Sequence, residues 1–286
     1  MRRPLAIAVL CALALPHGAL SDEAVDAAEG GRRIVSLNLC ADELLMRLVP
    51  DEVASVTWFG KDPAASTVAA KAAAIPANHG LAEEAVAFDP DLVVAGRYTA
   101  QAAVSFLERI GVDVFVMDVP ATLDEARRSI LDLADRLGVP ERGAALVREM
   151  DEAMAPLQAD IGRPRALVLN PNGFTAGAHS IAGELIARAG LDNAAQDLGV
   201  SGYGAVPLET VILGDVDVLI VDAEPEALPS LATDILRHPA LRDMQRRIVT
   251  ARVPARLWTC AGPQMGDVVT ILAEAARRAR AMRAVR

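Results

Sequence analysis

The sequence has 286 residues, enough for one large domain or two modest ones, and 52% of them are hydrophobic, so a large core can form. The formal net charge is −10 at pH 7. Because the phosphates of nucleic acid require a basic protein face, this acidic balance argues against a nucleic-acid partner.

Residues 1–21 have the pattern of a secretory signal peptide. Two arginines precede a continuous apolar run at residues 5–15, and residues 19–21 form a small-x-small cleavage site. The run is too short to span a bilayer comfortably. We therefore expect export to the periplasm and a mature chain with 26 basic and 38 acidic residues, a formal charge of −12. Residues 22–32 are small, acidic and unpatterned, which is typical of a flexible lead-in.

Strands and helices alternate through the first part of the mature chain. Apolar runs and helical periodicity predict strands at 34–39, 53–58, 92–95 and 112–117, with helices at 41–48, 82–88 and 100–110. Gly111 is a helix-stop residue after the third helix. This alternation is typical of a parallel α/β sheet.

The alternation ends between residues 122 and 161, where no strand is predicted. Apolar residues recur there at helical spacing, and Gly138–Pro140 interrupts them before a second helical stretch at 141–160. We expect either one long helix with a kink or two helices in line. The segment is rich in Ala, Leu and Arg and not in Gly and Ser, so it should be stiff.

Strands resume at 166–169, 218–221 and 248–250, and a helix at 267–283 closes the chain. The predicted fold class is α/β, with two Rossmann-like lobes that have parallel sheets and are joined by a long, stiff α-helical connector. The predicted boundaries are 33–121 for the first lobe, 122–162 for the connector and 163–286 for the second lobe. A ligand would bind in the cleft between the lobes.

Two segments about 126 residues apart match each other, at residues 81–95 and 208–222. Each begins with an acidic residue, continues as a short apolar helix and ends in a buried strand. Glu83 and Glu209 are the acidic residues, with Glu84 as the competing choice in the first segment. Such residues can complement the helix dipole, or they can dock a two-fold symmetric partner, and both roles can hold at once.

Cleft residues of a parallel α/β fold lie at the carboxyl ends of strands or in the loops that follow. Aromatic residues make up only 3% of the chain, yet both tryptophans and both tyrosines fall in these loops, which favours contact with a large flat ligand. Alternatively, the tryptophans plug the lobe edges and the loop arginines are solvated charges. The candidate ligand-binding residues are Asn38, Cys40, Trp58, Arg97, Tyr98, Asn172, Phe174, Tyr203, Arg256, Trp258 and Cys260.

Two cysteines, Cys40 and Cys260, remain after loss of the signal peptide, one in each predicted lobe. A disulfide between them would staple the lobes across the cleft mouth. Two free thiols could instead ligate a soft metal, or the two cysteines could be separate. A disulfide would prevent wide opening of the cleft, which would argue against a bulky ligand.

The chain resembles the substrate-binding proteins of ABC importers for cobalamin, ferric siderophores and haem, which have two lobes joined by one long helix. The resemblance covers roughly residues 32–280 and is carried by the order and spacing of several pieces. These are Arg33–Asn38 (RIVSLN), Phe88–Ala95 (FDPDLVVA), Leu107–Val112 (LERIGV), Gly183–Asn193 (GELIARAGLDN) and Gly202–Glu209 (GYGAVPLE).

The resemblance implies a monomeric, non-enzymatic protein without a cofactor that delivers a metal chelate to the dimeric permease of an ABC importer in the inner membrane. One glutamate of each lobe pairs with permease arginines in this family, and by position these glutamates match Glu83 and Glu209. Cobalamin needs mostly apolar and aromatic contacts, whereas a carboxylate-rich siderophore would want more arginines than this cleft offers. A corrinoid is therefore the favoured cargo, with a ferric siderophore or haem next.

A second hypothesis is a free-metal receptor or a metalloenzyme. His79 and His179 could join Cys40 and Cys260 in the cleft to hold a metal ion. The sequence lacks His-Glu-x-x-His, Gly-x-Ser-x-Gly and Cys-x-x-Cys patterns, so the usual hydrolase and thioredoxin-type chemistries are not indicated.

Overall fold

The computed structural model describes residues 31–98, 101–155, 162–223, 232 and 235–285. The predicted signal peptide and nearly all of the lead-in lie outside the described residues. The chain from Arg32 to Arg286 forms one compact unit, and the lobe boundaries proposed within it stay predictions. None of the helices in the described ranges combines the length and apolar character needed to cross a membrane.

The first sheet has five parallel strands in the order β3-β2-β1-β4-β5. Its strands are β1 (Ile34–Ser36), β2 (Val53–Thr57), β3 (Ala77–Asn78), β4 (Leu92–Gly96) and β5 (Val114–Met117). Its connections contain helices α1 (Leu39–Leu48), α2 (Ala69–Ala72), α3 (Ala82–Val86) and α4 (Gln101–Arg109), and the 3₁₀ turns η1 (Pro50–Glu52) and η2 (Trp58–Lys61). Every residue of the central strands β1 and β4 is buried, as expected of a sheet covered on both faces.

The second sheet has four parallel strands in the order β11-β10-β6-β8. These are β6 (Arg165–Val168), β8 (Asp192–Asn193), β10 (Val218–Asp222) and β11 (Val249–Val253). A separate two-stranded antiparallel sheet pairs β7 (Phe174–Ala176) with β9 (Tyr203–Ala205). The helices are α7 (Ile181–Arg188), α8 (Leu208–Leu213), α10 (Pro239–Gln245) and α11 (Met265–Val285). The 3₁₀ turns are η3 (Pro171–Gly173), η4 (Ala194–Leu198), η5 (Ile235–Arg237) and η6 (Ala255–Leu257).

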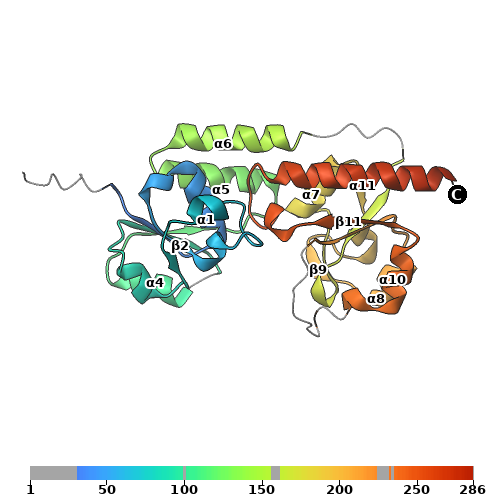
Figure 1. Cartoon of the computed structure of the whole chain (residues 1–286), viewed down its shortest axis with the longest axis horizontal. Coiled ribbons are helices and arrows are strands. Elements are labelled where there is room, and N and C mark those ends of the chain that lie inside the picture. Colours follow the sequence, from blue (N-terminus) through green and yellow to red (C-terminus); the bar gives the residue numbers. More distant parts are fainter. Residues whose placement is uncertain (1–30, 99–100, 156–161, 224–231, 233–234, 286) are drawn as a thin grey trace, which may run out of the picture. The chain divides into compact units, whose positions relative to one another are not determined.

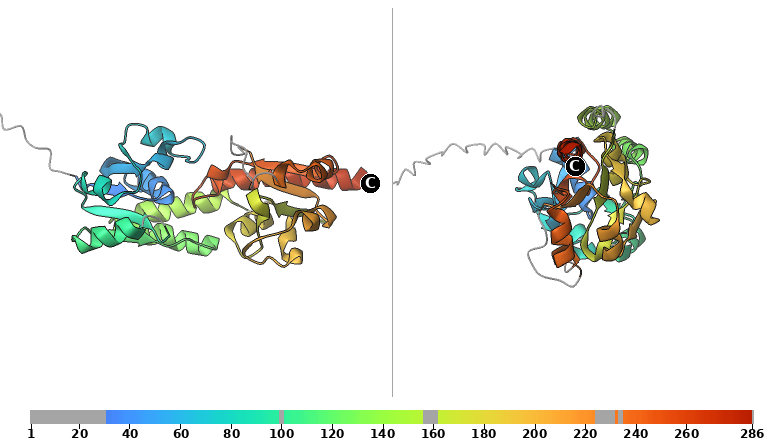
Figure 2. Two further views of the ribbon diagram at one scale, coloured as in Figure 1. Left: turned by 90° about the horizontal axis from the view of Figure 1, so that it is seen from below. Right: turned by 90° about the vertical axis from the view of Figure 1, so that its right-hand side faces the viewer.

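Two helices packed side by side, α5 (Leu123–Arg136) and α6 (Pro140–Ala153), form the described part of the connector (Figures 1 and 2). The expectation of one kinked helix or two helices in line is therefore wrong. Gly138 has a φ of 74°, a left-handed conformation that ends α5 and reverses the chain. A Cβ atom on Gly143 would lie 2.3 Å from the Cβ of Ala134, so the glycine lets the two helices approach closely.

Both connector helices run between the two sheets. At the start of α5, the backbone N–H of Leu123 donates to Oε1 of Glu184 on α7 at 3.1 Å. At its end, Arg136 pairs with Asp113 beside β5. After α6, the carbonyl of Met154 accepts from Arg188 at the end of α7 at 3.2 Å. The fold class is thus confirmed: two parallel α/β sheets are joined by a helical connector. The connector passes between the two sheets twice, once along α5 and once along α6.

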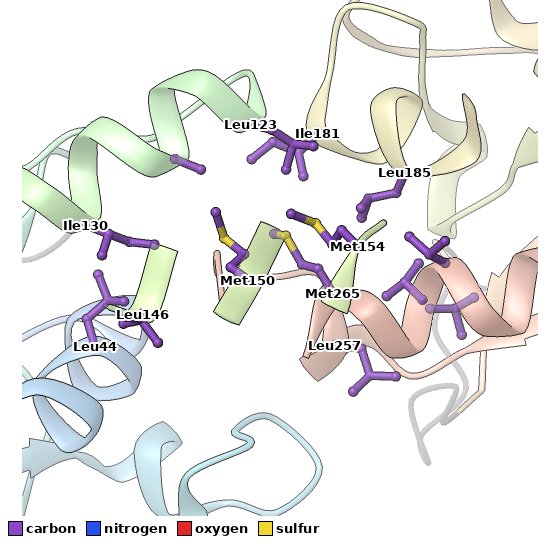
Figure 3. Packing of buried hydrophobic residues seen from close by; sticks show 14 of the residues in the cluster. Leu44, Leu123, Ile130, Leu146, Met150, Met154, Ile181, Leu185, Leu257 and Met265 are labelled. Carbon is purple, nitrogen blue, oxygen red and sulfur yellow. The ribbon is translucent and has the colours of Figure 1, made fainter. Parts of the chain in front are cut away.

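One hydrophobic cluster extends without interruption from the first sheet to the second. Along β4, alternate residues face this shared core and a smaller cluster that belongs to the first sheet alone. The residues of β10 alternate in the same way between the shared core and a cluster of the second sheet. Figure 3 shows the middle of the shared core, formed by Leu44, Leu123, Ile130, Leu146, Met150, Met154, Ile181, Leu185, Leu257 and Met265.

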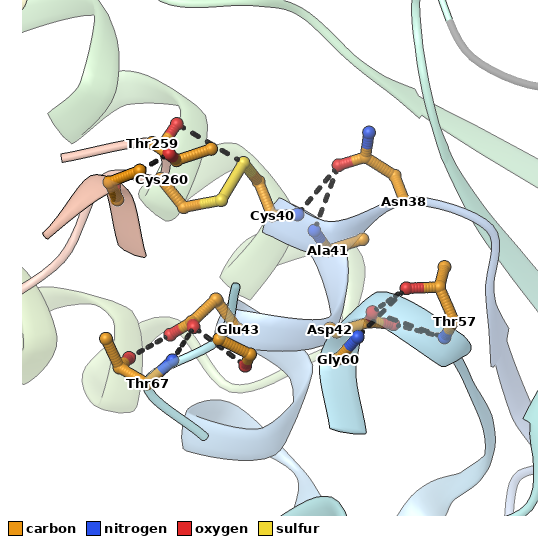
Figure 4. Close-up of a disulfide and its surroundings, with 12 residues drawn as sticks. Asn38, Cys40, Ala41, Asp42, Glu43, Thr57, Gly60, Thr67, Thr259 and Cys260 are labelled. Atoms are coloured by element: carbon orange, nitrogen blue, oxygen red, sulfur yellow. Dashed lines mark hydrogen bonds between the residues drawn. A yellow bond between two sulfur atoms is a disulfide. The ribbon is translucent and has the colours of Figure 1, made fainter. Parts of the chain in front are cut away.

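A buried carboxylate on α1 fixes the turn that follows β2 (Figure 4). Asp42 is fully buried, and its oxygens accept hydrogen bonds from the backbone N–H of Thr57 at 3.0 and 3.2 Å and from the Thr57 hydroxyl. A Cβ atom on Gly60 would lie 2.5 Å from Oδ2 of Asp42, so only glycine leaves room for this contact. Asp42 thereby positions η2, which carries Trp58 and Phe59.

The neighbouring carboxylate, Glu43, fixes the loop after η2 in the same way. It is 1% exposed and accepts from the Ser66 hydroxyl at 3.0 Å and from the Thr67 backbone N–H at 2.6 Å. Arg47, one turn along α1, lies 3.4 Å from its other oxygen. Two adjacent acids on one helix thus organise the polar loops of the first sheet.

We expect Gly143→Leu to destabilise the protein by about 1–3 kcal/mol, because the larger side chain must displace Ala134 in the contact between α5 and α6. Urea denaturation followed by circular dichroism measures the change. Ala145→Leu, at an exposed position of the same helix, is the matched control and should have little effect. Equal stability of the two variants would contradict the close helix contact.

Burial raises the pKa of Asp42 to about 7, whereas the unfolded chain has an ordinary value near 3.9. At a pH between these two pKa values, Asp42 is protonated in the folded state and ionised in the unfolded state. The stability of the protein therefore falls as the pH rises from about 4 to about 7. Asp42→Asn removes this titration. The stability of the variant relative to wild type should therefore rise across that window by on the order of a few kcal/mol.

Denaturation midpoints at intervals from acidic to mildly alkaline pH measure this effect. Asp51→Asn, at an exposed acid just after α1, is the control. If Asp42→Asn and wild type have parallel pH profiles, Asp42 does not titrate in this range.

Candidate functional site

A cavity of about 250 Å³ lies between the two sheets at the carboxyl ends of their strands. Gly96 and Met117, which end β4 and β5, line it from the first sheet, and Val168, which ends β6, lines it from the second. The inner face of α5 contributes Ser129 and Ile130. This is the position at which parallel α/β folds hold their ligands.

Six of the predicted ligand-binding residues line this inter-sheet cavity: Asn38, Cys40, Phe174, Tyr203, Trp258 and Cys260. Asn38 also caps α1, because its Oδ1 accepts from the backbone N–H groups of Cys40 at 2.9 Å and Ala41 at 3.3 Å. Phe174 and Tyr203 come from the paired strands β7 and β9, and their rings stack with centroids 5.9 Å apart. Burial raises the pKa of the Tyr203 phenol.

A second hollow of about 630 Å³, the Arg97–Tyr98 groove, is continuous with the cavity. The two share the segment Met117–Pro120 and Ser129. Arg97 pairs with Asp118, which lowers the pKa of that carboxyl and raises the pKa of the guanidinium. Tyr98 is 74% exposed along the groove, so its ring is available to a ligand.

A third hollow of about 360 Å³, the Trp58–Phe59 groove, adjoins the cavity at Asn38. The two rings stack with centroids 3.8 Å apart, and Trp58 is 45% exposed. The structure thus places Trp58 beside the cavity, with Asn38 between them. His79 lines the same groove.

The other two predicted ligand-binding residues, Asn172 and Arg256, do not line any of these three hollows among the described residues. Asn172 has a φ of 58° inside η3, so it serves the turn that leads into β7. Arg256 lies in η6, two residues before Trp258.

Sequence reasoning missed several lining residues. The segment Met117–Pro120 follows β5, so the same rule about strand ends could have found it. Ile130 and Ile181 belong to a helical periodicity that predicts core positions, and they are core residues that also line the cavity. Nothing in the sequence distinguishes these two from other core residues.

Cys40 and Cys260 form a disulfide, with their Cα atoms 5.1 Å apart (Figure 4). Of the three interpretations left open by the sequence, the disulfide is confirmed, and the interpretations as thiolate metal ligands and as separate cysteines are wrong. The bond joins the first turn of α1 to the loop between η6 and α11.

The structure does not support the free-metal hypothesis either. Sulfurs joined in a disulfide are not the thiolates that bind metal ions. Within the ranges that the structure describes, no group of three or more His, Cys, Asp and Glu residues could hold a metal ion. His79 is instead held by Glu84, with Nδ1 3.0 Å from Oε1.

The two candidate docking acids occupy equivalent positions in short helices. Glu83 is the second residue of α3, Glu209 is the second residue of α8, and both are exposed. Glu84, the competing choice, accepts from the backbone N–H of His79 at 2.6 Å, which lowers the pKa of its carboxyl. Glu84 therefore has a local role in the His79 loop.

The chemistry of the cavity suits binding. Its lining includes one carboxylate, from Asp118, and, among the residues that the structure describes, no lysine, arginine or histidine. Amide and hydroxyl groups of Asn38, Asn170, Ser129 and Thr259 are spread over an otherwise apolar lining. Such a lining can bury an apolar body and hydrogen-bond its polar rim.

Comparison with known proteins places this architecture among binding proteins. A cobalamin-binding protein of Halobacterium salinarum is 26% identical over 234 residues, which cover 79% of this chain and 63% of that protein. The match thus spans less than two thirds of the relative's length.

Solved structures share the fold. The apo form of the periplasmic haem-binding protein RhuT from Roseiflexus sp. RS-1 has a TM-score of 0.67 at 24% identity, over 86% of this chain and all of that one. The periplasmic vitamin B12 binding protein BtuF of Vibrio cholerae has a TM-score of 0.61 at 18% identity, over 87% of this chain and 98% of that one.

The family model described as periplasmic binding protein matches residues 34–245. The match covers all of the first sheet and most of the second, and it includes the disulfide partner Cys40, both connector helices and both candidate docking acids. The relatives above are likewise named as binding proteins. The chain therefore belongs to the periplasmic binding protein family.

Proposed function

We propose that this protein is a periplasmic solute-binding protein that captures a metal chelate in the inter-sheet cavity and delivers it to the permease dimer of an ABC importer in the inner membrane. The cargo we favour is a corrinoid such as cobalamin, before a ferric siderophore or haem. The family supports a periplasmic location, and the signal-peptide pattern at residues 1–21 supports the same location independently.

The observation that carries the choice of cargo is the absence of lysine, arginine and histidine from the described lining of the cavity. Haem has two propionates and many siderophores have carboxylates, and such groups require basic partners when they are buried. Two arginines, Arg97 and Arg128, line the adjoining groove, and Arg97 is already paired with Asp118. The rim of a corrinoid instead has neutral amides, which can hydrogen-bond Asn170, Ser129 and Thr259.

The size of the hollows is consistent with a large cargo that is only partly enclosed. The Cys40–Cys260 disulfide prevents wide opening of the cleft, and a cargo that lies mostly in an open groove does not require such opening. A cavity of about 250 Å³ cannot hold a whole corrinoid, but it continues into the Arg97–Tyr98 groove of about 630 Å³. In this arrangement the edge of the ring system would enter the cavity between Phe174 and Trp258, and its appendages would lie along the groove. The cobalamin-binding relative and the vitamin B12 binding structure support the same cargo class.

We expect one of a panel of cobalamin, cobinamide, haemin and ferric siderophores to quench tryptophan fluorescence saturably, with sub-micromolar affinity. The chain has two tryptophans, of which Trp258 lines the cavity and Trp58 lies in the adjoining groove. Trp58→Phe should therefore keep most of the quenching, and Trp258→Phe should lose most of it. Free tryptophan corrects for absorption by the ligand.

Two results would count against this proposal. If no chelate binds, the protein does not carry this class of cargo. If haemin binds tightly and neither corrinoid does, the charge argument from the cavity lining is wrong, although a chelate remains the cargo.

Permease docking through Glu83 and Glu209 is part of the same proposal. Both acids are exposed at the second position of a short helix, and each helix has an exposed leucine at its edge, Leu81 at 55% and Leu213 at 86%. A short helix that exposes both a carboxylate and an apolar side chain can pair with an arginine and bury a small contact area.

We expect the double variant Glu83→Ala/Glu209→Ala to lower chelate uptake in cells at least about tenfold while leaving the affinity of the purified protein unchanged. Glu149→Ala/Glu152→Ala removes the same charge from exposed positions of α6 and is the matched control. Uptake of a labelled chelate and binding in solution are measured side by side. Loss of ligand binding in the first variant would contradict the docking assignment.

A further inference from the structure

The inter-sheet cavity and the Arg97–Tyr98 groove meet at a neck, which consists of the segment Met117–Pro120 and Ser129. The neck residues line both hollows, whereas the other described lining residues belong to only one of the two. A cargo that is larger than the cavity and continues into the groove must therefore pass over the neck. Its rim contacts the side chains of the neck in any orientation that fills both hollows.

Asp118 brings a negative charge to this neck. Among the residues that the structure describes, it is the only charged side chain in the lining of the cavity. Its ion-pair partner, Arg97, lines the groove but not the cavity. Pairing with Arg97 lowers the pKa of the Asp118 carboxyl, so this group is ionised at neutral pH. A ligand group that enters the cavity thus meets a carboxylate at the neck, and the counter-charge lies on the groove side.

Hydrogen bonds on both sides of Asp118 hold its backbone in place. Before it, the carbonyl of Met117 accepts from the backbone N–H of Arg97 at 2.9 Å, where β4 and β5 end side by side. After it, the backbone N–H of Ala121 donates to Oε2 of Glu125, in the first turn of α5, at 2.7 Å. The segment is therefore anchored at the sheet and at the helix, and the carboxylate stays at the neck.

The groove does not supply excess positive charge that could offset Asp118. The charged residues in its described lining are two arginines and three acids: Arg97, Arg128, Asp118, Glu125 and Asp132. Arg128 lies 4.0 Å from Glu125, so each arginine already faces a carboxylate. Because like charges that are brought together repel, a carboxylate on the rim of a cargo is disfavoured at the neck. A neutral amide is not repelled, and it can hydrogen-bond the hydroxyl of Ser129.

We propose that Asp118 is a specificity-determining residue that selects corrinoids with amide side chains over corrinoids with free carboxylates on the same ring. This inference rests on the proposed function. The lack of basic partners in the cavity disfavours any anionic cargo, and Asp118 extends this selection to corrinoids that differ only in the amidation of their side chains. It acts by repelling the wrong ligand, and Arg97 moderates this repulsion from the groove side.

The test compares cobinamide, whose ring side chains are amides, with cobyrinic acid, which has the same corrin ring with carboxylic acids in their place. Binding to the purified, exported protein is measured by tryptophan fluorescence at neutral pH and physiological ionic strength. We expect wild type to prefer cobinamide and Asp118→Asn to reduce this preference at least about tenfold. The change should appear as tighter binding of cobyrinic acid, because the variant lacks the repelling charge and leaves Arg97 able to pair with a ligand carboxylate.

Arg97→Gln is the reciprocal variant. It keeps the charge of Asp118 and removes its counter-charge, so the preference for cobinamide should increase. If the ion pair only stabilised the loop, breaking it from either side would change the preference in the same direction. Circular dichroism checks that each variant retains its structure.

The Arg136–Asp113 ion pair provides matched controls. Neither residue belongs to the described lining of the cavity or the groove. Asp113→Asn and Arg136→Gln change the net charge by the same amounts as Asp118→Asn and Arg97→Gln. Both control variants should keep the preference of wild type.

The possible results separate the two proposals. If corrinoids bind but Asp118→Asn keeps the preference of wild type, or the two neck variants shift it in the same direction, Asp118 does not determine specificity, although the proposed function stands. Equal shifts in the control variants also overturn the inference, because net charge then explains them. If only haemin binds, the proposed cargo is wrong, and tighter haemin binding by Asp118→Asn supports repulsion at the neck, whereas unchanged binding overturns it. If no chelate binds any form, both proposals fail.

Discussion

The shared hydrophobic core is the interaction on which the rest of this structure depends. Alternate residues of β4 and β10 point into it from the two sheets, and α5, α6 and α11 fill the space between them. Because protein interiors are close-packed, a core of this kind resists relative motion of the elements that share it. The inter-sheet cavity is bounded by the same core, with Leu44, Ile130 and Met265 belonging to both. The site is therefore built on a floor that is already rigid before any ligand binds.

The main outlines of this arrangement could be predicted from the sequence because they depend on local patterns. Short, fully apolar runs such as Leu92–Ala95 and Val218–Val221 are typical of strands covered on both faces, and both runs form such strands. The rule that ligands bind at the carboxyl ends of parallel strands then selected Asn38, Tyr203 and Trp258, which the structure brings together around one cavity. The docking role of Glu83 and Glu209 stays a prediction.

The features that the sequence left open depend on contacts between distant residues. Periodicity shows that α5 and α6 are helices, but their antiparallel packing depends on the left-handed conformation of Gly138 and on the space left by Gly143. The pairing of Cys40 with Cys260 depends on the positions of α1 and the loop before α11, which no local pattern gives. The antiparallel pairing of β7 with β9 was missed because both strands are short and α7 and β8 lie between them in the chain. Each of these cases requires the tertiary structure.

The electrostatics of the chain fit a neutral cargo and a basic partner at the same time. A protein with a net charge of −10 repels anionic molecules at long range, and its cavity adds the Asp118 carboxylate with, among the described residues, no basic side chain in the lining. An anionic chelate would therefore meet an unfavourable field outside and no counter-charge inside. The same negative field accelerates association with a basic surface, such as the arginines expected on a permease. One charge distribution can thus disfavour anionic chelates and steer the loaded protein to its transporter. This requires that the groups that bind the cargo are neutral amides and hydroxyls.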